Sequence, residues 1–325
     1  MEPELILGGV IPANLMAFDA DLEIDERNHR RHIRYLVDTP GVTGLTTNAH
    51  ASEVATLTLE EQQRSLDITL DEVAGKVPVI CGVYEDGTHK SAQIAKMAER
   101  QGADCLLVFP SAVFDFGHQL RPEIAYRHIA TIAEATVLPI VVFVYPATSG
   151  LHIPTENLVK ICNEIDNVIA IKEWSNDIGT YERNYRELKA LDKNISVLSS
   201  FSKSLLASLC VGADGILSGH GSVIADLHTE MLEALTRGDL EVARQVADRI
   251  YPVVQVTYAE PFLDGHNRMK EALVILGRLD EAHVRPPLQR ISEAEREEIR
   301  RVVTEAELPG AHRGQPHAST VKGHA

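Results

Sequence analysis

Residues 77–109 read VPVICGVYEDGTHKSAQIAKMAERQGADCLLVF, and this stretch contains the repeating unit of the fold. Residues 77–82 and 105–109 are nearly continuous apolar runs, which is typical of strands that are buried on both faces. Between them, residues 91–101 carry apolar side chains at spacings of three and four, as an amphipathic helix does, and Gly102 is suited to end that helix. The stretch therefore predicts a strand, a helix and a second strand parallel to the first.

The same alternation runs along most of the chain. Six more apolar runs predict strands at residues 7–11, 42–46, 140–144, 168–171, 196–199 and 215–217. Eight strands separated by helices predict an α/β fold with a parallel sheet, and eight is the number that closes into a (β/α)8 TIM barrel. An open doubly wound sheet is the alternative, but no GxGxxG loop follows the first strand and no break divides the chain into halves.

The chain divides into three predicted parts. Residues 5–236 form the barrel. Residues 237–308 predict a C-terminal helical extension packed on the barrel, with helical patterns at residues 240–256, 268–279 and 293–306. Residues 309–325 are rich in Gly, Pro, His and Ser with little apolar content, so we expect a disordered tail there.

The composition argues against several classes of partner. The 325 residues include 31 Lys and Arg against 47 Asp and Glu, which gives a net charge of −16. An acidic surface repels phosphate backbones and anionic membranes, so neither nucleic acid nor a membrane is expected as a partner. The N-terminus has no basic segment followed by an apolar run, and no apolar stretch approaches the roughly 18 residues that a membrane span needs. We therefore expect a cytoplasmic protein.

The cysteines and two of the histidines have simple structural interpretations. None of the four cysteines forms a CxxC pair and each lies in an apolar stretch, so we expect them to be buried and reduced. His29 and His32 are three residues apart, a spacing that can hold a metal, but they lie among four arginines that would repel a cation. A solvated basic helix face is our interpretation of this segment.

Lys172 is the residue on which the functional prediction depends most. In a TIM barrel the active site lies at the C-terminal ends of the strands, and Lys172 directly follows the apolar run 168–171. A charged amine is costly at a buried strand end, so its pKa should fall. A free amine attacks ketones to form an imine, which acts as an electron sink. The structural alternative is a lysine that reaches the barrel mouth and pairs with Glu173.

Two other predicted strand ends carry hydroxyl groups. Thr46 and Thr47 lie at the end of the second strand, where paired hydroxyls with adjacent amides suit the carboxylate of an oxo acid. Tyr145 follows the fifth strand, where a phenol can relay a proton to and from a substrate. Threonines that cap a turn and a tyrosine at the barrel rim are the structural alternatives, and the residues alone do not decide between them.

Six segments occur in the order and at the spacings of one known family. They are Gly44-Leu-Thr-Thr47 with Ser52-Glu53, Pro139-Ile140 through Tyr145-Pro146, Ala170-Ile-Lys172-Glu173, Gly212-Ala-Asp-Gly215, Arg268-Met-Lys-Glu-Ala272 and Val284-Arg-Pro-Pro287. On these segments the chain, from about Gly8 to Arg300, resembles the dihydrodipicolinate synthase and N-acetylneuraminate lyase family of class I aldolases and dehydratases. The first segment is similar to the family's Gly-Thr-Thr-Gly-Glu loop.

The resemblance implies specific roles for the residues already named. Lys172 is expected to form the imine with a 2-oxo acid, Thr46 and Thr47 to hold its carboxylate, and a tyrosine near position 145 to move protons. No metal and no organic cofactor are implied, because the imine itself is the electron sink. Members are commonly homotetramers, so a homotetramer is expected.

Several departures from the family pattern indicate a divergent member. The loop from Thr46 to Glu53 is longer than the family's and introduces His50. Aligned without gaps, the family's catalytic tyrosine falls on Phe143, which is two residues before Tyr145 and on the same side of the strand. The tyrosine pair after the fourth strand and the arginine after the fifth, both present in the synthases, are absent. Dihydrodipicolinate synthase proper is therefore not the expected activity.

The predicted function is a carbon–carbon or carbon–oxygen lyase that acts on a 2-oxo acid such as pyruvate or a 2-keto-3-deoxy acid, by aldol cleavage or by dehydration. Further candidates for substrate contact at the barrel mouth are His50, Ser218, Gly219 and His220. The histidines titrate near neutral pH, although hydrogen-bonded loop histidines are the structural alternative. Two other functions stay open: a sensor that binds an oxo acid without turnover, and a metal-dependent lyase in which Glu173, His50 and His220 bind the ion.

Overall fold

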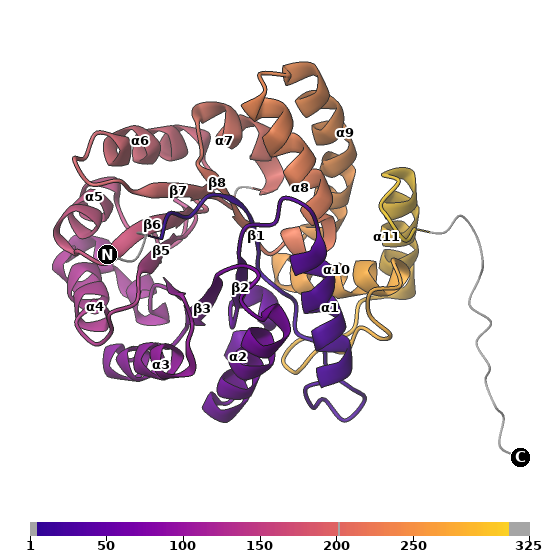
Figure 1. Ribbon diagram of the computed structural model, residues 1–325, viewed down its shortest axis with the longest axis horizontal. Helices are drawn as coiled ribbons and strands as arrows, with labels where there is room; N and C mark the ends of the chain where they lie inside the picture. The colour runs from indigo at the N-terminus through magenta and orange to yellow at the C-terminus, as the bar shows by residue number, and fades with distance from the viewer. Residues whose placement is uncertain (1–4, 201, 312–325) are drawn as a thin grey trace, which may run out of the picture.

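The computed structural model describes residues 5–200 and 202–311, and these form a barrel with helices around it (Figure 1). Its strands are β1 (Gly9–Pro12), β2 (Leu45–Thr47), β3 (Val79–Val83), β4 (Cys105–Val108), β5 (Ile140–Val144), β6 (Val168–Glu173), β7 (Ser196–Ser199) and β8 (Gly215–Ser218). They form one parallel sheet in the order β1-β8-β7-β6-β5-β4-β3-β2. Single parallel bridges from Val10 to Val42 and from Ala13 to Thr46 bring the two ends of that sheet together. The predicted TIM barrel is confirmed.

Helices alternate with the strands and cover the outside of the barrel (Figure 1). They are α1 (Glu26–Asp38), α2 (Leu59–Val73), α3 (Thr88–Gln101), α4 (Glu123–Ala133), α5 (Thr155–Glu164), α6 (Ile178–Lys189), α7 (Leu205–Val211) and α8 (Gly221–Thr236). Local sequence explains their ends: Thr58 and Glu61 form a capping box at the start of α2, and Gly102 ends α3 with a φ of 95°. Short 3-10 helices occupy some of the loops, among them η1 (His50–Ser52) and η2 (Val54–Thr56) after β2.

The predicted C-terminal helical extension is also present. It consists of α9 (Leu240–Thr257), α10 (Gly265–Ile275) and α11 (Glu293–Glu305), which lie beside the barrel in Figure 1. Helix α9 packs against α8, and α10 packs against α8, α9 and α11. Most of the predicted tail, residues 312–325, lies outside the described residues.

Two local expectations about strand β2 and the cysteines are wrong. Strand β2 begins at Leu45 rather than at residue 42, because Val42 makes only a single bridge to Val10 while continuous pairing with β3 starts at Leu45. The cysteines are all free, but Cys210 is exposed, and only the other three are buried as expected. Cys210 lies on the outer side of the short helix α7, where solvent reaches it.

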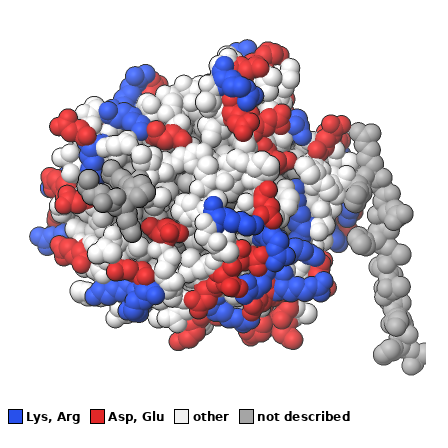
Figure 2. All heavy atoms as spheres, in the orientation of Figure 1, with Lys and Arg blue, Asp and Glu red and all other residues white. Residues whose placement is uncertain are grey.

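The expectation of a solvated basic face on α1 is wrong for its histidines. His29 and His32 are fully buried, and the backbone N–H of Leu15 donates to Nε2 of His32 over 3.3 Å. Arginines occupy the outer side of the helix, where Arg30 pairs with Asp71 of α2 over 2.6 Å. On the face shown in Figure 2, positive and negative side chains are interspersed. No helix of the described chain is long and apolar enough to cross a bilayer.

Candidate active site

A cavity lies at the C-terminal ends of the strands, where TIM barrels place their active sites. Its wall comes from strand ends, from the loop after β2 and from the C-terminal extension. The lining residues are Ala13, His50, Ala51, Phe143, Lys172, Trp174, Ser200, Gly219, Tyr258, Phe262 and His266. One amine, two imidazoles, a phenol and a serine hydroxyl among aromatic rings suit a small polar ligand.

Lys172 is the next-to-last residue of β6, and its side chain lines this cavity. The residue is only 5% exposed, and its Nζ lies 4.1 Å from the centroid of the Phe143 ring. No ion pair reaches the amine from the described part of the chain. Burial takes the ammonium ion out of water and lowers the pKa of Lys172 to about 7. A large fraction of the amine is therefore uncharged near neutral pH.

Glu173 lies on the opposite face of β6, because side chains alternate along a strand. Its Oε1 accepts a hydrogen bond from Asn184 over 3.0 Å, and its Oε2 accepts from Ser175 over 3.2 Å. Burial raises the pKa of Glu173 to about 7. Glu173 therefore does not pair with Lys172. Residues 5–200 and 202–311 contain no group of three or more His, Cys, Asp or Glu that could hold a metal, so Glu173 is not brought together with His50 and His220.

His50 and Tyr145 form a hydrogen-bonded pair at the cavity wall. Tyr145 directly follows β5, and its Oη lies 2.6 Å from Nε2 of His50. The imidazole stacks on Phe109 with ring centroids 4.9 Å apart. Burial lowers the pKa of His50 to about 3 and raises the pKa of Tyr145, so both groups are neutral at pH 7. Since the phenol keeps its proton, we assign Tyr145 as the donor to Nε2, which leaves the imidazole proton on Nδ1.

Phe143 lines the cavity between the lysine and the tyrosine. Its ring centroid lies 4.8 Å from that of Tyr145, so the two side chains are on the same side of β5, as their spacing predicts. The position that carries the catalytic tyrosine in the family pattern therefore faces Lys172 with a ring that has no hydroxyl. The phenol of Tyr145 is directed to His50 instead.

The hydroxyls of Thr46 and Thr47 are not part of the cavity lining. Thr47 Oγ1 lies 3.3 Å from Ser65 Oγ and accepts from Thr69 Oγ1 over 3.2 Å, so it faces helix α2 on the outside of the sheet. Thr46 Oγ1 is buried with no hydrogen-bond partner in the described chain. The chain continues past β2 before it reaches the cavity, and the residues that arrive there are His50 and Ala51.

Of the three candidates at the end of β8, only Gly219 lines the cavity. Ser218 Oγ lies 3.1 Å from Ser202 Oγ and accepts from the backbone N–H of His220. His220 is fully buried, its Nε2 lies 3.1 Å from Thr257 Oγ1, and burial lowers its pKa to about 3. Ser218 and His220 therefore support the wall without facing the cavity.

Three lining residues come from the C-terminal extension and were not among the sequence-based candidates. Tyr258 lies at the end of α9, Phe262 on the short helix η6 (Phe262–Asp264) and His266 in the first turn of α10. A search for polar residues at the C-terminal ends of strands cannot find these three residues, because they follow no strand. His266 is followed by the polar residues Asn267 and Arg268, so the local sequence gives no signal that it faces a cavity.

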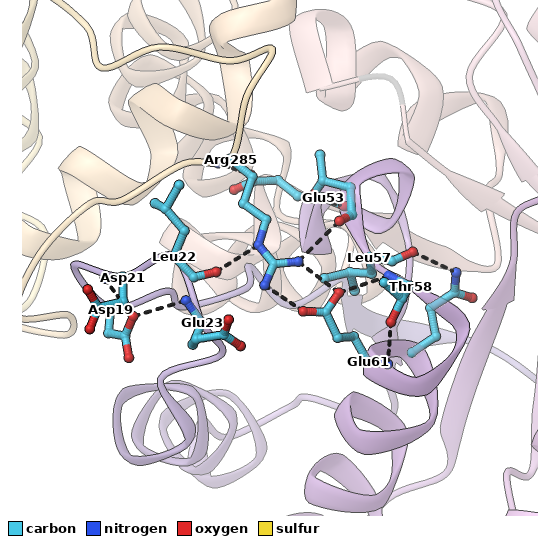
Figure 3. A network of polar contacts seen from close by, with 11 residues as sticks. Asp19, Asp21, Leu22, Glu23, Glu53, Leu57, Thr58, Glu61 and Arg285 are labelled. Atoms are coloured by element: carbon cyan, nitrogen blue, oxygen red, sulfur yellow. Dashed lines mark hydrogen bonds and ion pairs between the residues drawn. The ribbon is translucent and has the colours of Figure 1, made fainter.

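Charged side chains hold the loop that carries His50, and Figure 3 shows the part of this network around Arg285, Glu53 and Glu61. Glu53, three residues further along that loop, forms an ion pair with Lys270 of α10, and both side chains are almost completely buried. The backbone N–H of Arg285 donates to Glu53 Oε2 over 3.2 Å, and its guanidinium pairs with Glu61 over 2.6 Å. The loop after β2 and the helix that carries His266 are thus tied to each other.

A model of the dihydrodipicolinate synthetase family matches residues 6–306 of this chain. The chain belongs to this family. The 4-hydroxy-tetrahydrodipicolinate synthase of Methanopyrus kandleri is 31% identical over 294 residues, which cover 90% of this chain and 94% of that protein. The synthase of the same name from Syntrophus aciditrophicus is 30% identical over 288 residues, covering 89% and 94%. The solved dihydrodipicolinate synthase of Thermotoga maritima superposes with a TM-score of 0.83 at 29% identity, covering 92% and 98%.

The loop after β2 is the clearest departure from the dihydrodipicolinate synthetase family pattern. Ser52-Glu53 matches the Gly-Glu end of the family's Gly-Thr-Thr-Gly-Glu loop. Counted back from Glu53, the positions of the family's two threonines are His50 and Ala51, and both line the cavity. These two residues are found when the chain is aligned with the family pattern at Glu53 rather than at Thr46 and Thr47.

Proposed function

We propose that this protein is a Schiff-base-forming lyase that acts on a 2-oxo acid through Lys172. The observation that carries the proposal is a buried lysine without an ion-pair partner in the described chain, at the C-terminal end of β6, with a pKa near 7. Such an amine is nucleophilic at neutral pH and adds to a ketone carbon. Membership of the dihydrodipicolinate synthetase family supports the same chemistry.

The reaction starts when the neutral amine adds to the C2 carbonyl and water leaves, which produces a protonated imine. The imine withdraws electrons from C3, so that either the C3–C4 bond can break or a hydroxyl at C4 can leave after C3 loses a proton. Both routes end in hydrolysis of the imine, and neither requires a metal or an organic cofactor. A 2-keto-3-deoxy acid provides the carbonyl and the C4 hydroxyl that these steps need, and pyruvate is the 2-oxo acid that aldol cleavage releases or, in the reverse direction, condenses.

Tyr145 and His50 form the proton path of this proposal. Tyr145 donates to Nε2 of His50, and His50 lines the cavity, so a proton that enters or leaves the imidazole passes through this pair. With its proton on Nδ1, His50 also offers an N–H donor to the substrate carboxylate. In this position the His50-Ala51 segment, rather than the hydroxyls of Thr46 and Thr47, contacts the carboxylate.

Tyr145→Phe should lower kcat by about 10²–10⁴-fold, because it removes the proton that the phenol exchanges with His50. Trapping of the pyruvate imine by borohydride should persist, since Lys172 is unchanged. The exposed Tyr251→Phe is the matched control and should leave kcat unchanged. Steady-state kinetics with the trapping assay checks both, and a kcat equal to the wild-type value would remove Tyr145 from the mechanism.

The pKa of Lys172 predicts the pH dependence of imine formation. Only the neutral amine adds to a ketone, so the rate of adduct formation with pyruvate should rise about tenfold per pH unit from about pH 5. It should level off above a midpoint near 7. Initial rates of borohydride-trapped adduct across this range measure the midpoint. A midpoint close to the ordinary lysine pKa of about 10.4 would contradict a desolvated amine.

A sensor that binds 2-oxo acids without turnover is the second candidate, and Phe143 in place of the family tyrosine is the observation that favours it. A panel of 2-oxo acids separates the two functions. A lyase releases product, and its activity survives added chelator. A sensor gives thermal stabilisation with no product. The lyase proposal includes assembly as a homotetramer in the cytoplasm, and sedimentation velocity tests the assembly.

A further inference from the structure

The C-terminal extension forms one wall of the cavity from aromatic rings and an imidazole. Phe262 stacks on Trp174 with ring centroids 5.5 Å apart and on Tyr258 with centroids 5.3 Å apart. His266 follows in the first turn of α10 and lines the same cavity. The extension therefore contributes a titratable group beside the apolar rings.

His266 differs from the other two histidines near the cavity in its hydrogen bonding. His50 is paired with Tyr145 and His220 with Thr257, whereas neither ring nitrogen of His266 has a partner in the described chain. A Cβ placed on Gly219 would lie 3.6 Å from Nε2 of His266. The absence of a side chain at Gly219 thus leaves space beside this nitrogen, at the end of β8.

His266 shares its surroundings electrostatically with the reactive amine. Burial lowers the pKa of His266 to about 4, and the positive charge of Lys172 contributes to the shift. His266 in turn contributes to the lowered pKa of His50. These three groups lie in one poorly solvated space, and His266 is neutral at pH 7 and able to accept a proton.

The position of His266 is held by a buried ion pair. Lys270 lies one helical turn after His266 on α10, and its side chain is almost completely buried. It pairs with Glu53 and donates to the backbone carbonyl of His283 over 2.7 Å. The helix that presents the imidazole is therefore anchored to the loop that presents His50.

The other oxygen and nitrogen groups near Lys172 are absent or already engaged. Phe143 has no hydroxyl, and the hydroxyl of Tyr145 is directed to His50. The phenol of Tyr258 interacts with the hydroxyls of Ser202 and Ser218. The hydroxyl of Ser200 also lines the cavity, but a hydroxyl is a much weaker base than an imidazole. Among the cavity-lining groups of the described chain, His266 is thus the imidazole that is free to accept a proton.

We propose that His266 is the base that removes the proton from the C4 hydroxyl of a 4-hydroxy-2-oxo acid held as an imine on Lys172. The inference rests on the function proposed above, and it selects aldol cleavage from the two reactions that the imine permits. Dehydration would instead need an acid at the leaving hydroxyl. His266 lines the cavity with open space beside its Nε2 at Gly219, and burial disfavours its protonated form, so the imidazole is placed as a proton acceptor.

The cleavage step balances in charge and atoms. The C4 hydroxyl proton moves to His266, the C4 oxygen becomes a carbonyl as the C3–C4 bond breaks, and the electron pair of that bond converts the imine to a neutral enamine. The positive charge thereby moves from the imine nitrogen to His266, so no new charge is separated in a poorly solvated cavity. His266 returns the proton to C3. Water then hydrolyses the imine, which is the step whose protons pass through Tyr145 and His50, and the shorter 2-oxo acid is released.

His266→Ala tests the assignment with two readouts. Cleavage of 4-hydroxy-2-oxopentanoate should fall by about 10²–10⁴-fold, while borohydride trapping of pyruvate on Lys172 should stay within about twofold of the wild-type level. Added imidazole should restore part of the lost cleavage, because it supplies the missing base. The matched control is His89→Ala, an exposed histidine at the start of α3, which should change neither readout.

Several results would overturn the assignment. They are cleavage by His266→Ala within about threefold of the wild-type rate, failure of imidazole to restore cleavage, and loss of trapping in that variant at an unchanged melting temperature. A wild-type protein that traps pyruvate but does not cleave 4-hydroxy-2-oxopentanoate also overturns it, and leaves the imine lyase intact. A wild-type protein that traps no pyruvate removes the proposed function itself. If the alanine variant does not fold, His266→Gln is judged by the trapping and cleavage criteria.

Discussion

Lys172→Met should abolish turnover, with a loss of about 10⁴-fold or more, and should at the same time make the protein more stable. Methionine fills a similar volume without a group that must lose its charge or its hydration. The pKa of Lys172 is about 7 in the folded protein against 10.5 in the free side chain. At pH 7 the unfolded chain therefore binds more protons at this lysine than the folded chain does, which corresponds to a cost of about 4 kcal/mol.

The sign of this effect sets its pH dependence. The cost of burying Lys172 is largest below pH 7 and falls to about 1 kcal/mol by about pH 10, as the unfolded lysine also loses its proton. Urea unfolding of both proteins at the two pH values measures the difference. The exposed Lys96→Met is the matched control and should change neither turnover nor stability. Retained turnover would contradict the catalytic role, and a less stable variant at pH 7 would contradict the burial of an unpaired amine.

Lys270→Met should destabilise the fold by about 3–5 kcal/mol, because it leaves the carboxylate of Glu53 buried without its ion-pair partner. The double variant Glu53→Leu with Lys270→Met removes both charges and should recover most of that loss. The reason is that desolvation of the two charges offsets much of their attraction, so removal of one charge is worse than removal of both.

A double-mutant cycle in urea measures the coupling between Glu53 and Lys270. The exposed pair of Lys76 and Asp38, with an N–O distance of 2.6 Å, is the matched control, and Lys76→Met should cost less than about 1 kcal/mol. If Lys270→Met costs no more than this control, the buried pair does not anchor the loop of His50 to α10.

The barrel could be predicted from the sequence because its strands are nearly continuous apolar runs. Every residue of β3, β4 and β5 is buried, which is the environment that such runs indicate. The position of Lys172 could be predicted for the same reason, since a polar residue that ends an apolar run lies at the C-terminal end of a strand. Strand boundaries were predicted less accurately. Val42 is apolar but makes only a single bridge, so β2 starts three residues later than its pattern suggests.

The direction of side chains after a strand could not be predicted in the same way. Thr46 and Thr47 have the residue types of a carboxylate site, but Thr47 faces α2, and the loop brings His50 and Ala51 to the cavity instead. Loop geometry decides this, and Asn48 and Glu53 both adopt left-handed backbone conformations that local propensity does not specify.

Long-range packing explains the site residues that the sequence did not predict. His266 reaches the cavity because α10 packs against the barrel, which no pattern near residue 266 reveals. The burial of Lys270 beside Glu53, 217 positions apart in the chain (270 − 53), likewise depends on that packing.

Borohydride reduction in the presence of pyruvate, followed by peptide mass spectrometry, tests most directly whether this protein works through an imine. We expect one reduced adduct per chain, on the peptide that contains Lys172, and no adduct in Lys172→Met. An unmodified Lys172 in a folded protein, or an adduct on a different lysine, would contradict the mechanism.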